Sequence, residues 1–156
     1  MQNSQGFSFI ELLVTLVIMG VLAMMAVPAM QMTVQRQKEA ELKSSLYDIR
    51  TALDNYKTAY DNKRIRNEIG ASGYPPNLQI LVDGVIDERN PDKDKIYFLR
   101  RLPQDPLVSP RQGVNGNWGI RSYASSADDP KEGADVYDIY STATGVGLNG
   151  NKYSQW

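Results

Sequence analysis

The sequence predicts an α+β fold in which a long N-terminal helix packs on a small antiparallel sheet. Three features indicate this class. Residues 7–30 form an apolar run whose single charge is Glu11, and residues 31–64 place apolar side chains at helical spacing. Short aromatic and β-branched segments, separated by glycine and proline, follow in the second half. A helix that precedes a group of strands is typical of α+β proteins.

Composition excludes several kinds of function. The 156 residues carry a formal net charge of -1, which offers no basic field to hold nucleic acid. The chain contains neither cysteine nor histidine, so disulfides, thiolate or imidazole metal ligands and the usual serine or cysteine nucleophile systems are excluded. Two large catalytic classes are thus removed, and no phosphate loop, zinc motif or nucleophile constellation appears in the sequence, so we expect no enzyme. The length leaves room for one small domain after the apolar N-terminus.

The apolar run is long enough to cross a membrane. Residues 7–30 would form a helix of about 36 Å, which exceeds the thickness of a bilayer core. A cleavable secretory signal is the alternative, because "AVPAM" offers small residues near a possible cut. The run is longer than a normal signal core, however, and "MQNSQG" contains no lysine or arginine. Charge bias alone leaves the orientation of the span open.

Glu11 raises the main functional question. In the first turn of a helix an acid is favoured by the helix dipole, which is a sufficient structural explanation. If the chain were cleaved after Gly6, however, Phe7 would gain a new α-amine about 6 Å along the helix from Glu11. The carboxylate could then pair with the amine of a neighbouring copy and fix one packing register. Gly20 and Pro28 should weaken or bend the helix locally, or are simply tolerated in a membrane helix.

The segment "GFSFIELLVTLVIMGVLAMMAVP" resembles the class III signal of type IV prepilins and type II secretion pseudopilins. The resemblance implies that Gly6 precedes the cleavage site, Phe7 is N-methylated, Glu11 acts in assembly, and Pro28 loosens the helix. The leader lacks the basic residues usual in that family, and Phe9 stands where an aliphatic residue is commoner. The implied organisation is a prepilin leader (1–6), a transmembrane assembly helix (7–30), its amphipathic continuation (31–64) and a pilin-like globular domain (65–156).

The second part of the helix carries one apolar stripe. Steps of three and four residues separate its members, which are Leu42, Leu46, Ile49, Leu53, Tyr56 and Tyr60. We expect this stripe to pack on the protein's own sheet; a two-stranded coiled coil is the alternative, although the stripe is short for one. Glu39 and Lys43 stand four residues apart and predict a small ion pair on a charged solvent face.

The C-terminal part predicts a short helix and several strands. Asn77 is a candidate cap and Gly84 a candidate stop for the helix in "NLQILVDG". Strands are expected from Ile96 and within "NWGIRSYAS" and "DVYDIYS", with "NKYSQW" as a last short strand. Apolar positions expected to face the core are Trp118, Ile120, Val136 and Ile139. The prolines of "LPQDP" predict a rigid turn, and we interpret that motif as structural rather than catalytic.

This half resembles the major pseudopilins of type II secretion in its order of "YPPNLQILV", "RLPQDP", "DVYDIYS" and a glycine-rich loop. That resemblance implies a calcium site in the loop, built from aspartates and backbone carbonyls. Here the loop reads "TATGVGLNGNKYSQW" and contains no acid, although hard cations prefer carboxylates. Asn149, Asn151 and carbonyls could contribute, but we assign no calcium site and expect no cofactor. The acids just upstream are interpreted as solvated, namely Asp128, Asp129, Asp135 and Asp138.

The loop also contains "GVGLNG", which matches a dinucleotide-binding pattern. Only six residues remain after it, so the helix and acid that such a site needs cannot follow, and we interpret it as a turn.

Taken with the resemblance, these features predict a structural subunit of the type II secretion pseudopilus. Its expected partners are further copies of itself, other pseudopilins, the prepilin peptidase, an inner-membrane assembly platform and the lipid bilayer. The domain would be periplasmic, and a cytoplasmic ATPase would supply energy because the chain has no P-loop. The alternatives are a minor type IV pilin for adhesion, motility or DNA uptake, and a single-pass anchored binding domain.

Overall fold

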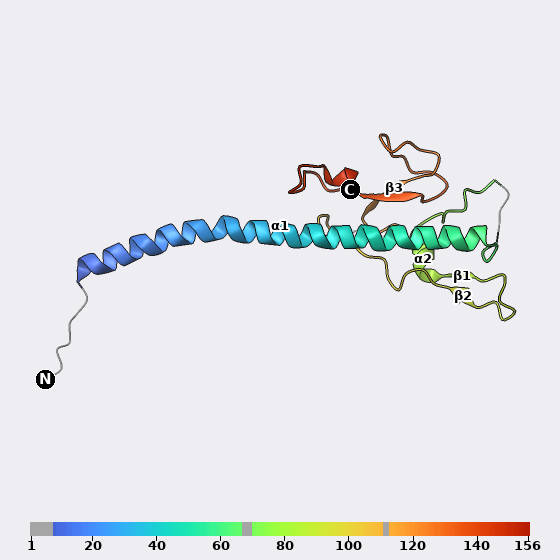
Figure 1. Ribbon diagram of the computed structural model, residues 1–156, viewed down its shortest axis with the longest axis horizontal. Helices are drawn as coiled ribbons and strands as arrows, with labels where there is room; N and C mark the ends of the chain where they lie inside the picture. Colours follow the sequence, from blue (N-terminus) through green and yellow to red (C-terminus); the bar gives the residue numbers. More distant parts are fainter. Residues whose placement is uncertain (1–7, 67–69, 111–112) are drawn as a thin grey trace. The chain divides into compact units, whose positions relative to one another are not determined.

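A computed structural model describes residues 8–66, 70–110 and 113–156, with the side chains of 25–29 left out (Figure 1). The predicted α+β class is confirmed: a long helix is followed by small antiparallel sheets that pack against it. In chain order the elements are α1 (Phe9–Asp61), α2 (Gln79–Asp83), β1 (Val85–Ile86), β2 (Lys95–Ile96), β3 (Trp118–Arg121), β4 (Asp138–Ser141) and the 3₁₀ turn η1 (Tyr153–Gln155). The chain divides into two units, residues 1–37 and 38–156.

Helix α1 begins and ends with identifiable backbone contacts. The Ser8 carbonyl accepts the N–H groups of Glu11 and Leu12 at 3.0 and 3.2 Å, which starts the helix. At the other end Lys63 takes a left-handed φ of 56°, and the Arg64 N–H bonds to the Ala59 carbonyl at 2.9 Å. A left-handed residue with a bond back into the last turn is a common way to end a helix.

The described strands form two separate two-stranded antiparallel sheets rather than the one sheet we expected. In the first, Val85 of β1 faces Ile96 of β2; in the second, Ile120 of β3 faces Ile139 of β4. The connection from β2 to β3 carries prolines at positions 103, 106 and 110. The described part of this connection, residues 97–110 and 113–117, adds no strand to either sheet, and proline cannot donate to a strand ladder.

The core of the unit formed by residues 38–156 lies where the apolar stripe of α1 meets these sheets. The predicted stripe is confirmed, since all its members except the half-buried Tyr60 are buried: Leu42, Leu46, Ile49, Leu53 and Tyr56. The predicted inward positions of the second half are also buried, namely Trp118, Ile120, Val136 and Ile139. The stripe is therefore covered by the protein's own domain, as expected, which leaves no apolar seam for a coiled coil in this part of α1.

Helix α2 has the predicted signals at both ends. The Asn77 side-chain oxygen accepts the Ile80 N–H at 3.2 Å, although the helix itself starts at Gln79. Gly84 follows the helix with φ 74°, and its N–H bonds to the Ile80 carbonyl at 3.0 Å. An added Cβ at Gly84 would lie 2.9 Å from the Ile96 carbonyl oxygen, so this position requires glycine.

The prediction of a last strand in "NKYSQW" is wrong. Residues Tyr153–Gln155 form η1, with the Gln155 and Trp156 N–H groups bonded to the carbonyls of Lys152 and Tyr153. Only an isolated bridge joins Val146 to Lys152 within the described residues. Tyr153, the first residue of this turn, is buried.

The β1–β2 hairpin is tied to the end of α1 by an ion pair. The Arg64 guanidinium donates to the Asp87 carboxylate from Nε at 3.1 Å and from Nη2 at 2.5 Å. These hydrogen bonds lower the pKa of Asp87 below its ordinary value of 3.8, against an opposing desolvation effect. The same contact raises the pKa of Arg64.

This ion pair predicts an acid-dependent loss of stability. Because the folded pKa of Asp87 is lowered, the pair stabilises the fold above the ordinary carboxyl range, and that contribution is lost as pH falls through the folded pKa. We expect the unfolding free energy of the wild type to fall more steeply in acid than that of Asp87→Asn, measured by urea unfolding at several pH values. Asp92→Asn, an exposed change in the same hairpin, should keep the wild-type slope. Parallel slopes for wild type and Asp87→Asn would contradict the assignment.

Candidate assembly helix

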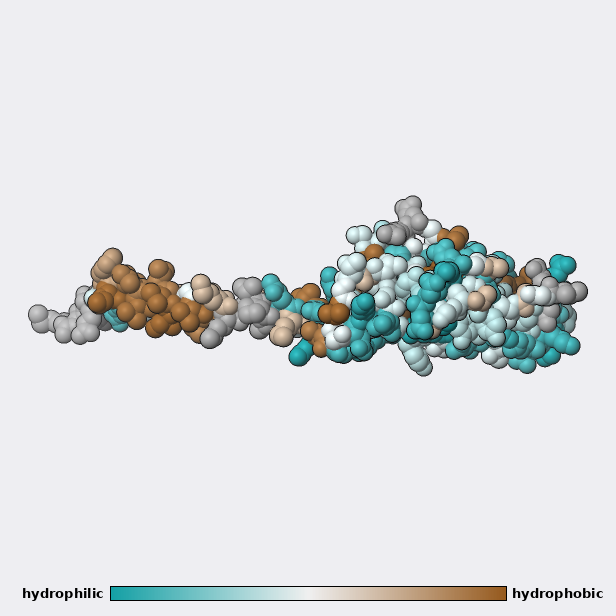
Figure 2. All heavy atoms as spheres, turned by 90° about the horizontal axis from the view of Figure 1, so that it is seen from above, coloured by the Kyte–Doolittle hydropathy of each residue, from teal (hydrophilic) through white to brown (hydrophobic). Residues whose placement is uncertain are grey.

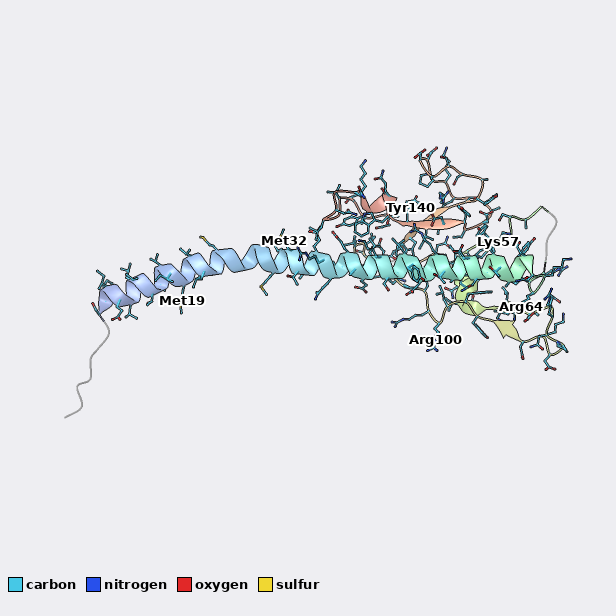
Figure 3. The ribbon with its side chains drawn as sticks, in the orientation of Figure 1. Met19, Met32, Lys57, Arg64, Arg100 and Tyr140 are labelled. Carbon is cyan, nitrogen blue, oxygen red and sulfur yellow. The ribbon has the colours of Figure 1, made fainter. Side chains whose placement is uncertain are left out.

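The N-terminal part of α1, residues 9–24, exposes apolar side chains along its length. Figure 2 shows one face of this surface. Met19 and Met32, for example, are 71% and 55% exposed, and their side chains project away from the helix (Figure 3). The exposed apolar set before the undescribed side chains is Phe9, Ile10, Leu12, Leu13, Val14, Leu16, Val17, Ile18, Met19, Val21, Leu22 and Met24. A helix that is apolar all round needs an apolar environment, which lipid or neighbouring helices can supply.

Glu11 interrupts this surface near its start. It lies in the first turn of α1 and is exposed, as the sequence predicted. An acid in that position is stabilised by the unpaired N–H groups and the positive end of the helix dipole. The polar Thr15 one turn later is satisfied locally, because its hydroxyl donates to the Leu12 carbonyl at 2.9 Å. Among the described residues of this apolar surface, Glu11 is therefore the one with a charged side chain.

The other predicted site residues stand as follows. Gly6 and Phe7 lie outside the described residues. Gly20 lies within α1, and a Cβ added there would meet nothing within 4 Å. The backbone at Pro28 is helical, while its side chain is not described, so its loosening effect stays a prediction. Among the residues that the structure describes, no helix meets the combined length and hydropathy expected of a membrane span.

Two side chains of α1 make contacts that sequence reasoning missed. Glu39 is buried at 7% exposure, and its Oε1 accepts the Leu148 N–H at 3.0 Å and the Tyr153 hydroxyl at 2.9 Å. The prediction that Glu39 belongs to a charged solvent face is wrong, because the glycine-rich loop folds over it. Lys43 instead lies over the Trp156 ring, 4.7 Å from its centroid.

Arg50 is the second of these residues. Its Nε donates to Asp138 at 2.8 Å, and its Nη2 donates to the main-chain oxygens of Ile139 and Trp156 at 3.1 and 2.8 Å. Arg121 bonds the other oxygen of Asp138 at 3.1 Å. One sequence feature could have predicted these contacts: Arg50 directly follows the core residue Ile49. A long charged side chain beside a core position often reaches across to a neighbouring element.

The upstream acids are not all solvated, which corrects our interpretation. Asp138 pairs with two arginines, and Asp135 accepts the Ser122 hydroxyl at 2.9 Å and the Tyr123 N–H at 2.8 Å. Asp128 and Asp129 are exposed, as expected. Within the described part of the chain, no three acidic side chains converge as metal ligands.

Comparison with known proteins shows to which class of protein this chain belongs. Residues 1–27 match the prokaryotic N-terminal methylation motif. A processing motif at the head of a long apolar helix, joined to a small α+β domain, defines a pilin-like protein. Type II secretion system core protein G of Klebsiella michiganensis is 32% identical over 139 residues, covering 86% of this chain and 90% of the relative. The chain belongs to the family of type II secretion system core protein G, the major pseudopilin.

Further relatives with the same name support the assignment. The protein of Pseudomonas aeruginosa is 33% identical over 142 residues, covering 86% of this chain and 91% of the relative. The protein of Dickeya chrysanthemi is 30% identical over 161 residues, covering 96% of this chain and 97% of the relative. No solved structure matches the chain. Pseudopilins are structural and not catalytic, so the chain is a building unit of a pseudopilus rather than an enzyme.

Proposed function

We propose that residues 7–30 hold this pseudopilin in the inner membrane, with residues 65–156 in the periplasm, until it is drawn into the pseudopilus. The observation that carries this proposal is the surface of the N-terminal part of α1, residues 9–24, where exposed apolar side chains surround one carboxylate, that of Glu11. Such a surface is stable in lipid, and equally among the helices of other copies. Residues 31–64 would continue the helix into the domain that coats the fibre.

Processing at the N-terminus prepares the helix for assembly. The prepilin peptidase would remove residues 1–6 after Gly6 and leave Phe7 with a free amine, which is then methylated. The match of residues 1–27 to the methylation motif supports both steps. An N-methylated amine keeps its positive charge, so it can still pair with a carboxylate.

The assembly step would match Glu11 with the Phe7 amine of a neighbouring copy. The two groups are four residues apart, about 6 Å along a helix axis, so a neighbour displaced by about one turn brings opposite charges together. In a low-dielectric surrounding this pair favours one register and penalises the others. Gly20 leaves room for close approach of another helix, and Pro28 would loosen the helix as it leaves the bilayer.

The proposed partners follow from this cycle. Other pseudopilins would contact the growing fibre, and an inner-membrane platform driven by a cytoplasmic ATPase would lift each subunit from lipid. Helix–helix packing must then replace lipid contact. The fibre would help to drive folded proteins outward. No observation favours the minor type IV pilin or the anchored binding domain, since the Klebsiella, Dickeya and Pseudomonas relatives all bear the name core protein G.

The processing step makes a direct prediction. Mass spectrometry of the protein from membrane fractions should find a mature chain that begins at Phe7 and carries one methyl group. Gly6→Val should leave the leader in place, because the small residue before the cut is lost. A mature terminus near Met30 would instead show ordinary secretion and would refute the proposal.

A further inference from the structure

The glycine-rich loop, residues 142–152, is the place where the family resemblance implies calcium. The donor set of this chain does not fit that ion. The loop contains no acid, and three of its carbonyls already accept hydrogen bonds: Gly145 accepts the Tyr153 N–H, Gly147 that of Gly150, and Asn151 that of Gly147. The Asn149 side-chain oxygen accepts the Asn151 N–H at 3.0 Å. Calcium needs six to eight oxygens, usually with carboxylates among them.

At the base of this loop the oxygen atoms surround the side chain of Arg50, not a metal ion. The Arg50 guanidinium donates to one carboxylate oxygen of Asp138, to the carbonyl oxygen of Ile139 and to the main-chain oxygen of Trp156, all within 3.1 Å. Carboxylate and main-chain oxygens are the kinds of ligand that a hard cation takes. Here they surround a fixed positive charge that the chain itself provides, and the guanidinium fork matches several acceptors at once.

The loop is held at a second point by Glu39. Its carboxylate lies about three helical turns before Arg50 on α1 and accepts from Leu148 and Tyr153. The Trp156 ring packs against Gly147 so closely that a Cβ there would lie 2.3 Å from the ring. The Glu39 carboxylate is therefore hydrogen-bonded to donors of the protein itself.

We propose that Arg50 acts as the built-in cation of the C-terminal segment and that, with Glu39, it closes the loop without a metal ion. These two residues and their acceptors and donors form what we call the loop clasp: Glu39, Arg50, Asp138, Ile139, Leu148, Tyr153 and Trp156. The clasp makes the loop indifferent to calcium, because a divalent ion at the same oxygens would be repelled by the guanidinium. This inference concerns the folded domain and does not depend on leader cleavage or on Glu11.

Hydrogen exchange of the full chain in detergent micelles tests the clasp. Protection of the amides of residues 145–156, read by mass spectrometry, should be the same in CaCl₂ and in EGTA. Arg50→Ala and Glu39→Ala should each speed exchange in this segment about tenfold or more, since each removes hydrogen bonds to a charged group. Glu39→Gln should retain most protection, because its amide oxygen can still accept.

Matched controls separate the clasp from general effects of charge. Arg101→Ala and Glu41→Ala, exposed changes of the same residue types, should leave exchange unchanged. Slower exchange of the wild-type segment in CaCl₂ than in EGTA would overturn the inference, even if a variant failed to fold. Unchanged protection in Arg50→Ala would also overturn it.

Discussion

Replacing Glu11 by alanine should abolish fibre assembly while leaving leader removal intact. Glu11 is the single charge between Phe7 and Gln35, and it lies in the first turn of an otherwise apolar helix. Without it, the amine of each arriving subunit would enter the fibre core without a partner. Loss of one partner of a desolvated pair costs about 3–5 kcal/mol. Each subunit addition would then weaken by about two orders of magnitude or more.

Two further variants define what Glu11 contributes. Glu11→Gln preserves size and hydrogen bonding but removes the charge, so it should fail as alanine does. Glu132→Ala removes an exposed acid of the domain and should assemble normally. Electron microscopy of sheared fibres and the ratio of precursor to mature chain on immunoblots measure the two steps separately. Normal fibres from Glu11→Gln would show that charge pairing does not set the register.

Replacing Asp105 by alanine should cause the largest loss of domain stability. Asp105 is 2% exposed, and its carboxylate accepts the Ser141 hydroxyl at 2.5 Å and the Leu107 N–H at 2.8 Å. Its backbone exchanges two hydrogen bonds with the side chain of Asn117, at 2.9 and 3.0 Å. Alanine would leave buried donors without acceptors and open a small cavity, which together cost about 3 kcal/mol.

Thermal and urea unfolding of the variant measure this cost. For a domain of this size a loss of about 3 kcal/mol lowers Tm by roughly 10 °C or more. Asp129→Ala, an exposed acid, should unfold as the wild type does. A change below about 0.5 kcal/mol in Asp105→Ala would mean that the turn does not depend on this carboxylate. The same result would also undermine the structural interpretation of "LPQDP".

Local patterns in the sequence predicted much of the fold because they arise from local physics. The stripe from Leu42 to Tyr56 follows from helical periodicity, and the signals at Asn77 and Gly84 follow from backbone hydrogen bonding at helix ends. The motif around Glu11 was found because its residues lie at fixed short spacings. The strands with Ile120 and Ile139 showed the expected aromatic and β-branched composition.

Contacts between distant parts of the chain could not be predicted in the same way. Glu39 meets Tyr153, and Arg50 meets Trp156, across more than 100 residues, so no short pattern marks them. The 3₁₀ turn that stands where a last strand was expected contains Tyr153, which takes part in one of these long-range contacts. The division into two sheets likewise depends on which strands pair, and no short pattern marks that pairing.

Cryo-electron microscopy of wild-type fibres would show whether Glu11 pairs with the amine of a neighbouring subunit. We expect density for a mature N-terminus at Phe7, with its amine within about 4 Å of the Glu11 carboxylate of an adjacent copy. Fibres in which that carboxylate has no amine partner, or in which residues 1–6 are still present, would contradict it.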